Sequence, residues 1–114
     1  DRLRRWDIRF DTRFGLGAPP TNGGEEAMLM DSILRCGGRI VPVELAPRLH
    51  PEESSGQAIN PTTAFTQGAV HWLVFGPSRW PALFLVYALK RVRSGEWDLV
   101  ADYAKGGKWA SRQA

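Results

Sequence analysis

The stretch Asn60-Pro61-Thr62-Thr63 separates two parts of this 114-residue chain that have different sequence patterns. Asparagine is a favoured helix N-cap and proline is favoured at the first helical position, so the stretch predicts a helix over about 61–75. The residues that follow predict two more helices, over about 78–93 and 97–104, and Gly106-Gly107 is expected to break the last one. Residues 60–114 are therefore expected to form a helical C-terminal extension.

Residues 1–59 show a mixed pattern instead. Apolar and charged side chains alternate over residues 6–10, which predicts a short strand, and residues 39–45 predict a second strand that Pro42 restricts to a sheet edge. Between them, residues 25–36 have apolar side chains at helical spacing, and Gly37-Gly38 is a natural stop. The predicted fold class is α/β, or α+β within the chain itself, with a few short strands and three to four helices.

Charge is uneven along the chain. Residues 1–78 hold eight Arg and nine acidic residues, whereas residues 79–114 hold seven Lys or Arg and three acidic residues. The ten residues 80–89 carry no charge, and this is too short for the roughly 20 apolar residues of a membrane-spanning helix. A buried helix and an interfacial helix over 79–93, on an anionic membrane surface, both stay open. Without a basic stripe among exposed aromatics, nucleic-acid binding is not expected.

Two further features limit the interpretation. Cys36 is the only cysteine, so it forms no intrachain disulfide and is expected to be a small buried thiol. The chain begins at Asp1 instead of Met, and we expect it to be a piece of a longer protein. A small sheet with unpaired edges would favour self-association, so a homo-oligomer is one expectation.

The most informative motif is a glycine-rich loop followed by two acids, Glu25-Glu26, at a predicted helix start. A carboxylate there can remove a proton from a substrate hydroxyl, but acids in a first turn more often only stabilise the helix dipole. His50, in the later polar loop, can bind a metal or phosphate, although a lone histidine is more often a surface or packed residue. His71 is expected to pack beside Trp72.

The order of several motifs resembles the second half of bacterial family 2 glycosyltransferases of the GT-A type, especially those that build surface polysaccharides. The motifs are Phe10-Asp11-Thr12-Arg13-Phe14-Gly15-Leu16-Gly17, Gly24-Glu25-Glu26, Gly37-Gly38-Arg39-Ile40-Val41-Pro42-Val43 and His50-Pro51-Glu52-Glu53-Ser54-Ser55-Gly56. Phe65-Thr66-Gln67-Gly68-Ala69 and Phe75-Gly76 are similar to the C-terminal tail of the same group. The resemblance covers nearly the whole chain.

The resemblance implies roles for individual residues. Glu26 would be the catalytic base of an inverting sugar transfer, and Glu25 would position the acceptor sugar or the helix start. The family pair commonly reads Glu-Asp, so this chain departs from it in the second acid. Asp11 and the loop from Gly15 to Gly17 would form the wall of the acceptor site.

The remaining implications concern cofactors and partners. His50 would be a metal or diphosphate ligand, and the full enzyme would use Mg²⁺ or Mn²⁺, a nucleotide-sugar donor and a saccharide or lipid-linked acceptor. The implied location is cytoplasmic, or peripheral at the inner face of the membrane.

A donor-binding half is not recognisable in the sequence. The chain has no Asp-x-Asp metal motif, no Gly-x-Gly-x-x-Gly fingerprint and no Walker loop. We therefore expect the chain alone to transfer no sugar. The alternative is a non-catalytic helical module that binds a membrane surface or a protein partner.

Overall fold

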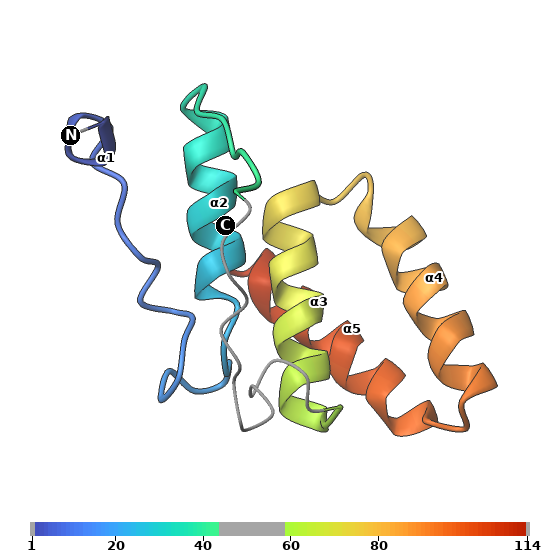
Figure 1. The fold of residues 1–114 in the computed structure, drawn as a ribbon. Helices are drawn as coiled ribbons and strands as arrows, with labels where there is room; N and C mark the ends of the chain where they lie inside the picture. The colour runs from blue at the N-terminus through green and yellow to red at the C-terminus, as the bar shows by residue number, and fades with distance from the viewer. Residues whose placement is uncertain (1, 44–58, 114) are drawn as a thin grey trace.

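The structure is a computed structural model that describes residues 2–43 and 59–113, and its described parts are helical (Figure 1). The helices are α1 (Arg2–Arg5), α2 (Glu25–Arg35), α3 (Pro61–Phe75), α4 (Trp80–Arg93) and α5 (Trp97–Ser111). No strand occurs in the described residues, so the predicted α/β class is wrong for them. None of these helices is long and apolar enough to cross a membrane.

Both predicted strands are absent from the described residues for the same physical reason. A strand exists only when its backbone groups pair with a neighbouring strand. Residues 6–10 form a turn followed by irregular backbone, residues 39–43 are irregular, and the two segments do not pair with each other. Residues 44 and 45 of the second predicted strand lie outside the described residues. The alternation of apolar and charged side chains over residues 6–10 therefore does not lead to a sheet, because no described segment pairs with them.

The helix predictions are largely confirmed. Asn60 caps α3 as expected: its side chain accepts from the backbone N–H of Thr63, and the Thr63 hydroxyl accepts from the backbone N–H of Asn60. The α2 helix stops at the predicted glycines, where the N–H of Gly37 donates to Leu34 and that of Gly38 donates to Ile33.

The predicted break at Gly106-Gly107 is wrong, because α5 continues to Ser111. Both glycines are buried, and a Cβ on Gly106 would collide with the carbonyl of Phe65 in α3. A Cβ on Gly107 would collide with the ring of Trp80 in α4. These glycines therefore let α5 approach its neighbours closely, and the packing offsets their weak helix propensity.

The α3 and α5 helices form the centre of the molecule. Gly68 of α3 lies against the backbone of Tyr103, so the two helices touch at Gly68 and at Gly106. Tyr103 is fully buried, and its ring stacks on Tyr87 of α4 with centroids 4.2 Å apart. The nitrogen of the Trp80 ring donates to the carbonyl of Gly68 over 3.1 Å. Much of the aromatic content of the chain thus forms the core instead of an interface.

The N-terminal region lies beside α3. The α2 helix is a neighbour of α3, and α1 lies on the far side of α2 from the three C-terminal helices (Figure 1). Phe14 is buried and meets Trp109 of α5 edge-on, with centroids 6.0 Å apart. Arg35, at the end of α2, donates to the carbonyl of Val74 over 3.1 Å. These contacts fix the start and the end of α2 on the C-terminal helices.

Candidate functional site

The glycine-rich loop before α2 adopts a conformation that requires its glycines. Gly15, Gly17, Gly23 and Gly24 all have positive φ angles, which residues with a Cβ rarely adopt. The N–H of Gly15 donates to the carbonyl of Gly23 over 3.2 Å and so closes the loop. The buried hydroxyl of Thr21 lies 2.7 Å from the carbonyl of Arg13, inside the loop.

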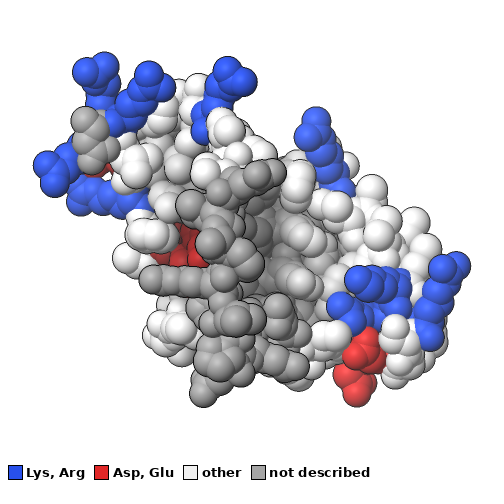
Figure 2. All heavy atoms as spheres, viewed as in Figure 1, with Lys and Arg blue, Asp and Glu red and all other residues white. Residues whose placement is uncertain are grey.

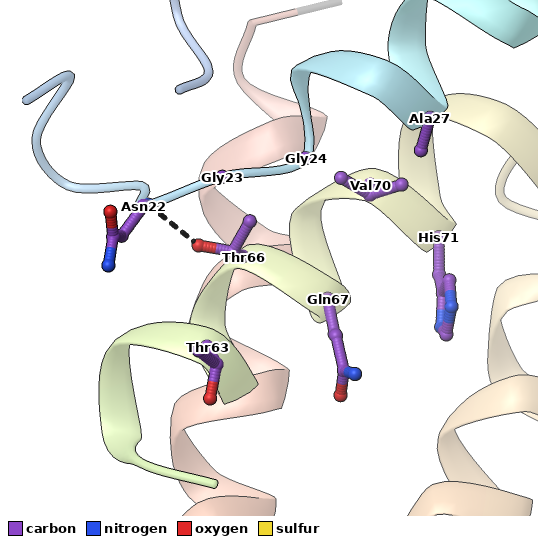
Figure 3. A pocket seen from close by; sticks show the side chains of 9 residues that line it. All are labelled: Asn22, Gly23, Gly24, Ala27, Thr63, Thr66, Gln67, Val70 and His71. Atoms are coloured by element: carbon purple, nitrogen blue, oxygen red, sulfur yellow. Dashed lines mark hydrogen bonds between the residues drawn. The ribbon is translucent and has the colours of Figure 1, made fainter. Parts of the chain in front are cut away.

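Gly24 attaches this loop to α3. It is the N-cap of α2, with φ 87°, and a Cβ at this position would lie 2.9 Å from Val70 and 3.1 Å from Thr66. The N–H of Asn22 donates to the hydroxyl of Thr66 over 3.0 Å (Figure 3). The first turn of α2, with its two acids, is therefore held in place by α3.

The two acids have different surroundings. Glu25 folds back under the loop, where a Cβ on Gly15 would lie 3.7 Å from its carboxyl carbon. Its Oε2 is buried and has no hydrogen-bond partner. Glu26 is exposed, and within residues 2–43 and 59–113 its carboxylate makes no hydrogen bond or ion pair. The structure thus brings Glu25 and Gly15 together and leaves the Glu26 carboxylate available to solvent.

Asp11 lies apart from these acids and is already engaged. Arg13 donates to it through Nη2 over 2.6 Å and through Nε over 2.9 Å. These bonds lower the pKa of Asp11 and raise the pKa of Arg13. Asp11 lines a shallow hollow along α2 with Ser32 and Arg35, and Gly17, which is not among the lining residues, has open space around it.

A pocket of ≈ 250 Å³ lies where the loop, α2 and α3 meet (Figure 3). Gly23, Gly24, Ala27 and Val70 supply apolar lining, and polar groups come from Asn22, Thr63, Thr66, Gln67 and His71. Neither Glu25 nor Glu26 is among its lining residues. The pocket and the exposed Glu26 both lie at the start of α2, but the Glu26 side chain does not line the pocket.

His71 lines this pocket, and its contact with Tyr103 could not be predicted from the sequence. Its Nδ1 lies 2.7 Å from the hydroxyl of Tyr103, and its ring meets Tyr103 and Phe75 edge-on. Burial lowers the pKa of His71 and raises that of Tyr103 to about 12, so both groups are neutral at pH 7. Because 32 positions separate the pair, no local pattern in the sequence marks it.

The described residues offer no metal centre. Within residues 2–43 and 59–113, no three His, Cys, Asp or Glu side chains lie together as a metal site requires. Asp11 is paired with Arg13, and His50 lies outside the described residues, so its role stays a prediction. Cys36 is exposed, so the expected buried thiol is wrong.

Comparisons with known proteins do not assign this chain. No model of a protein family, no curated protein and no solved structure matches it.

Proposed function

We propose that this chain is the acceptor-side portion of an inverting glycosyltransferase of the family 2 type, and that Glu26 is its catalytic base. The observation that supports the proposal most is the different treatment of two adjacent acids. Glu25 is enclosed by the glycine loop, while Glu26 is exposed on the same helix turn, and its carboxylate has no partner among the described residues. A base must reach its substrate hydroxyl, and of these two acids the exposed Glu26 suits that role better.

The proposed chemistry is a single displacement. The Glu26 carboxylate accepts the proton of an acceptor hydroxyl while that oxygen attacks the anomeric carbon of the donor sugar. The bond from the anomeric carbon to the nucleotide diphosphate breaks on the opposite face, so the configuration inverts. The transition state has oxocarbenium character, as in glycoside hydrolysis.

The chain's own residues would contribute binding and positioning. The glycine loop brings backbone groups to the surface without side chains, and the side-chain amide of Gln67 lines the adjacent pocket. Such groups suit a saccharide, which offers hydroxyls as donors and acceptors. A donor nucleotide and its divalent cation would need a portion of protein that this sequence does not contain. His50 remains the proposed contact to metal or diphosphate.

The proposal is tested by mapping saccharide binding on the ¹⁵N-labelled chain by NMR. With a panel of mono- and disaccharides, we expect amide shifts at residues 15–26 and around the pocket, and weak binding. Glu26→Gln should keep this binding, because the residue acts on the proton and not on affinity. Shifts confined to α4 and α5, or none with any saccharide, would refute an acceptor site. Incubation with nucleotide sugars should give no transfer, and turnover by the chain alone would contradict the missing donor half.

A further inference from the structure

The α4 helix has an exposed outer face. Leu85, Val86 and Leu89 are 58%, 66% and 50% exposed, and at this spacing they lie on one side of the helix. Trp80, Phe84 and Tyr87 instead pack around Tyr103 in the core. The apolar residues of α4 thus divide between a packed inner face and an exposed outer one.

Cations border this outer face and acids are absent from the helix. α4 carries Lys90, Arg91 and Arg93 in its last turn and no Asp or Glu in its sequence. Arg91 turns inward, with its guanidinium 5.2 Å from the centre of the Tyr87 ring and 2.9 Å from Glu96. Lys90 and Arg93 are exposed, and neither forms an ion pair with another residue of the described ranges 2–43 and 59–113.

The apolar and cationic groups meet in one shallow hollow. It has a volume of ≈ 450 Å³ and is lined by Val86, Leu89, Lys90, Arg93 and Ser94. Figure 2 shows basic side chains gathered at the lower right, toward the end of α4, with acidic side chains below them and an uncharged surface above. Trp97, 65% exposed at the start of α5, lies just after this end of the helix.

We propose that the outer face of α4 docks on a membrane surface that contains anionic lipids. The apolar side chains would enter the boundary between headgroups and acyl chains, and Lys90 and Arg93 would meet lipid phosphates. The 14 residues of α4 are too few to span a bilayer, so the helix would lie in the plane of the interface. This inference is independent of the proposed sugar transfer.

The positive charge of α4 favours an anionic membrane surface over a neutral apolar partner. The α2 helix offers a contrast, because Met30 and Leu34 are also exposed, at 43% and 53%. However, α2 carries three acids, Glu25, Glu26 and Asp31, and one base, Arg35. An anionic surface would repel α2 and attract α4, although both helices expose apolar side chains one turn apart.

The test is co-sedimentation of the 114-residue chain with vesicles of phosphatidylcholine, with and without phosphatidylglycerol. We expect binding only to vesicles with the anionic lipid, and weakening by added salt. The double variant L85Q/L89Q should bind at least about tenfold more weakly, because two leucines no longer enter the interface. Substitution K90Q/R93Q should weaken binding by about tenfold or more and reduce its salt dependence.

The matched control is M30Q/L34Q, which removes two exposed apolar side chains at the same spacing from α2. It should bind the anionic vesicles as tightly as the unchanged chain. Circular dichroism and thermal unfolding of each variant check that the fold is kept, as expected for exposed positions. Absence of binding to anionic vesicles, or equal loss in M30Q/L34Q, would overturn the proposal. So would a dimer, seen by light scattering without lipid, that L85Q/L89Q abolishes.

Discussion

The three C-terminal helices and the N-terminal region up to residue 43 are built in different ways. The α3 and α5 helices touch through their backbones, and Tyr103 between them is fully buried. In the N-terminal region, Phe14 and Met28 are the only buried large apolar side chains among the described residues. Exposed apolar residues are instead frequent there, among them Phe10, Leu16, Ile40, Val41 and Val43.

This difference shows which region carries the stability and which carries the candidate site. The C-terminal helices bury their aromatic rings against one another and supply the surface on which the loop lies. The loop and α2 attach through Phe14 and Met28, which pack with Ala69, Val70 and Ala110, and through the hydrogen bond from Asn22 to Thr66. The position of Glu26, in the first turn of α2, therefore depends on α3.

The largest expected effect comes from separating α3 and α5. Gly106→Ala places a methyl group against the carbonyl of Phe65, and Gly68→Ala places one against that of Tyr103. Each should lower the free energy of unfolding by about 3 kcal/mol, measured by urea or thermal denaturation.

Helix propensity alone predicts that both substitutions would raise the free energy of unfolding instead of lowering it. Alanine is favoured over glycine by about 1 kcal/mol in a helix, so without a close contact both substitutions would stabilise the chain. Ala101→Ser, on the exposed side of α5, is the control and should change stability little. A higher melting temperature for Gly106→Ala would show that the helices do not meet there.

A smaller effect is expected from detaching the N-terminal region. Gly24→Ala combines a positive φ with a Cβ that would lie 2.9 Å from Val70, so it should cost about 2 kcal/mol. Gly17→Ala is the matched control, because Gly17 also has a positive φ but has open space around it. It should cost about 1 kcal/mol.

Hydrogen exchange distinguishes detachment from general destabilisation. In Gly24→Ala, amides of the loop and of α2 should exchange faster while those of α3 and α5 keep their protection. Uniform loss of protection across all helices would instead mean that the two regions unfold as one unit, and the proposed division of the molecule would be wrong.

The His71–Tyr103 pair predicts a pH dependence. Burial lowers the pKa of His71, so the unfolded chain binds its proton more readily than the folded chain. Stability should be highest above the unfolded pKa of about 6.5 and should fall as the pH decreases through the folded pKa, by about 1.4 kcal/mol for each unit of difference. His71→Gln should flatten the profile between pH 5 and pH 7, as followed by melting temperature. A profile unchanged in this variant would assign the dependence to other groups.

The sequence predicted the fold where the signal is local. Asn60 and Pro61 mark the start of α3, and Gly37 marks the end of α2, because caps act through neighbouring residues. The sequence did not predict correctly the features of the fold that depend on contacts between residues distant in the chain. Residues 39–43 have the composition of a strand but find no paired strand among the described residues, and Gly106-Gly107 continues a helix because α3 and α4 pack on it.

The candidate site was also predicted from the sequence only in its local features. The glycine run and the two acids at a helix start are visible in the sequence, and the structure places them at the start of α2. The sequence does not distinguish Glu25 from Glu26 by environment, because the enclosure of Glu25 depends on how Gly15 folds back. The pocket is likewise invisible, since Asn22 and Thr66 meet across 44 positions.

The smallest effects should separate the two acids. Glu25→Ala removes the carboxylate that packs under Gly15 at the start of α2, and should cost about 1 kcal/mol through lost packing and the lost dipole interaction. Glu26→Ala, at an exposed neighbour, should change stability by less than about 0.5 kcal/mol. Both are measured by thermal unfolding at pH 7, where the two carboxylates are compared in the same turn of the same helix. If Glu26→Ala proved the more damaging, Glu26 would have a structural role, and its assignment as a base would lose its main support. The expected order would instead mean that the stability of the fold does not depend on the exposed Glu26 side chain, which is what we expect of a catalytic residue.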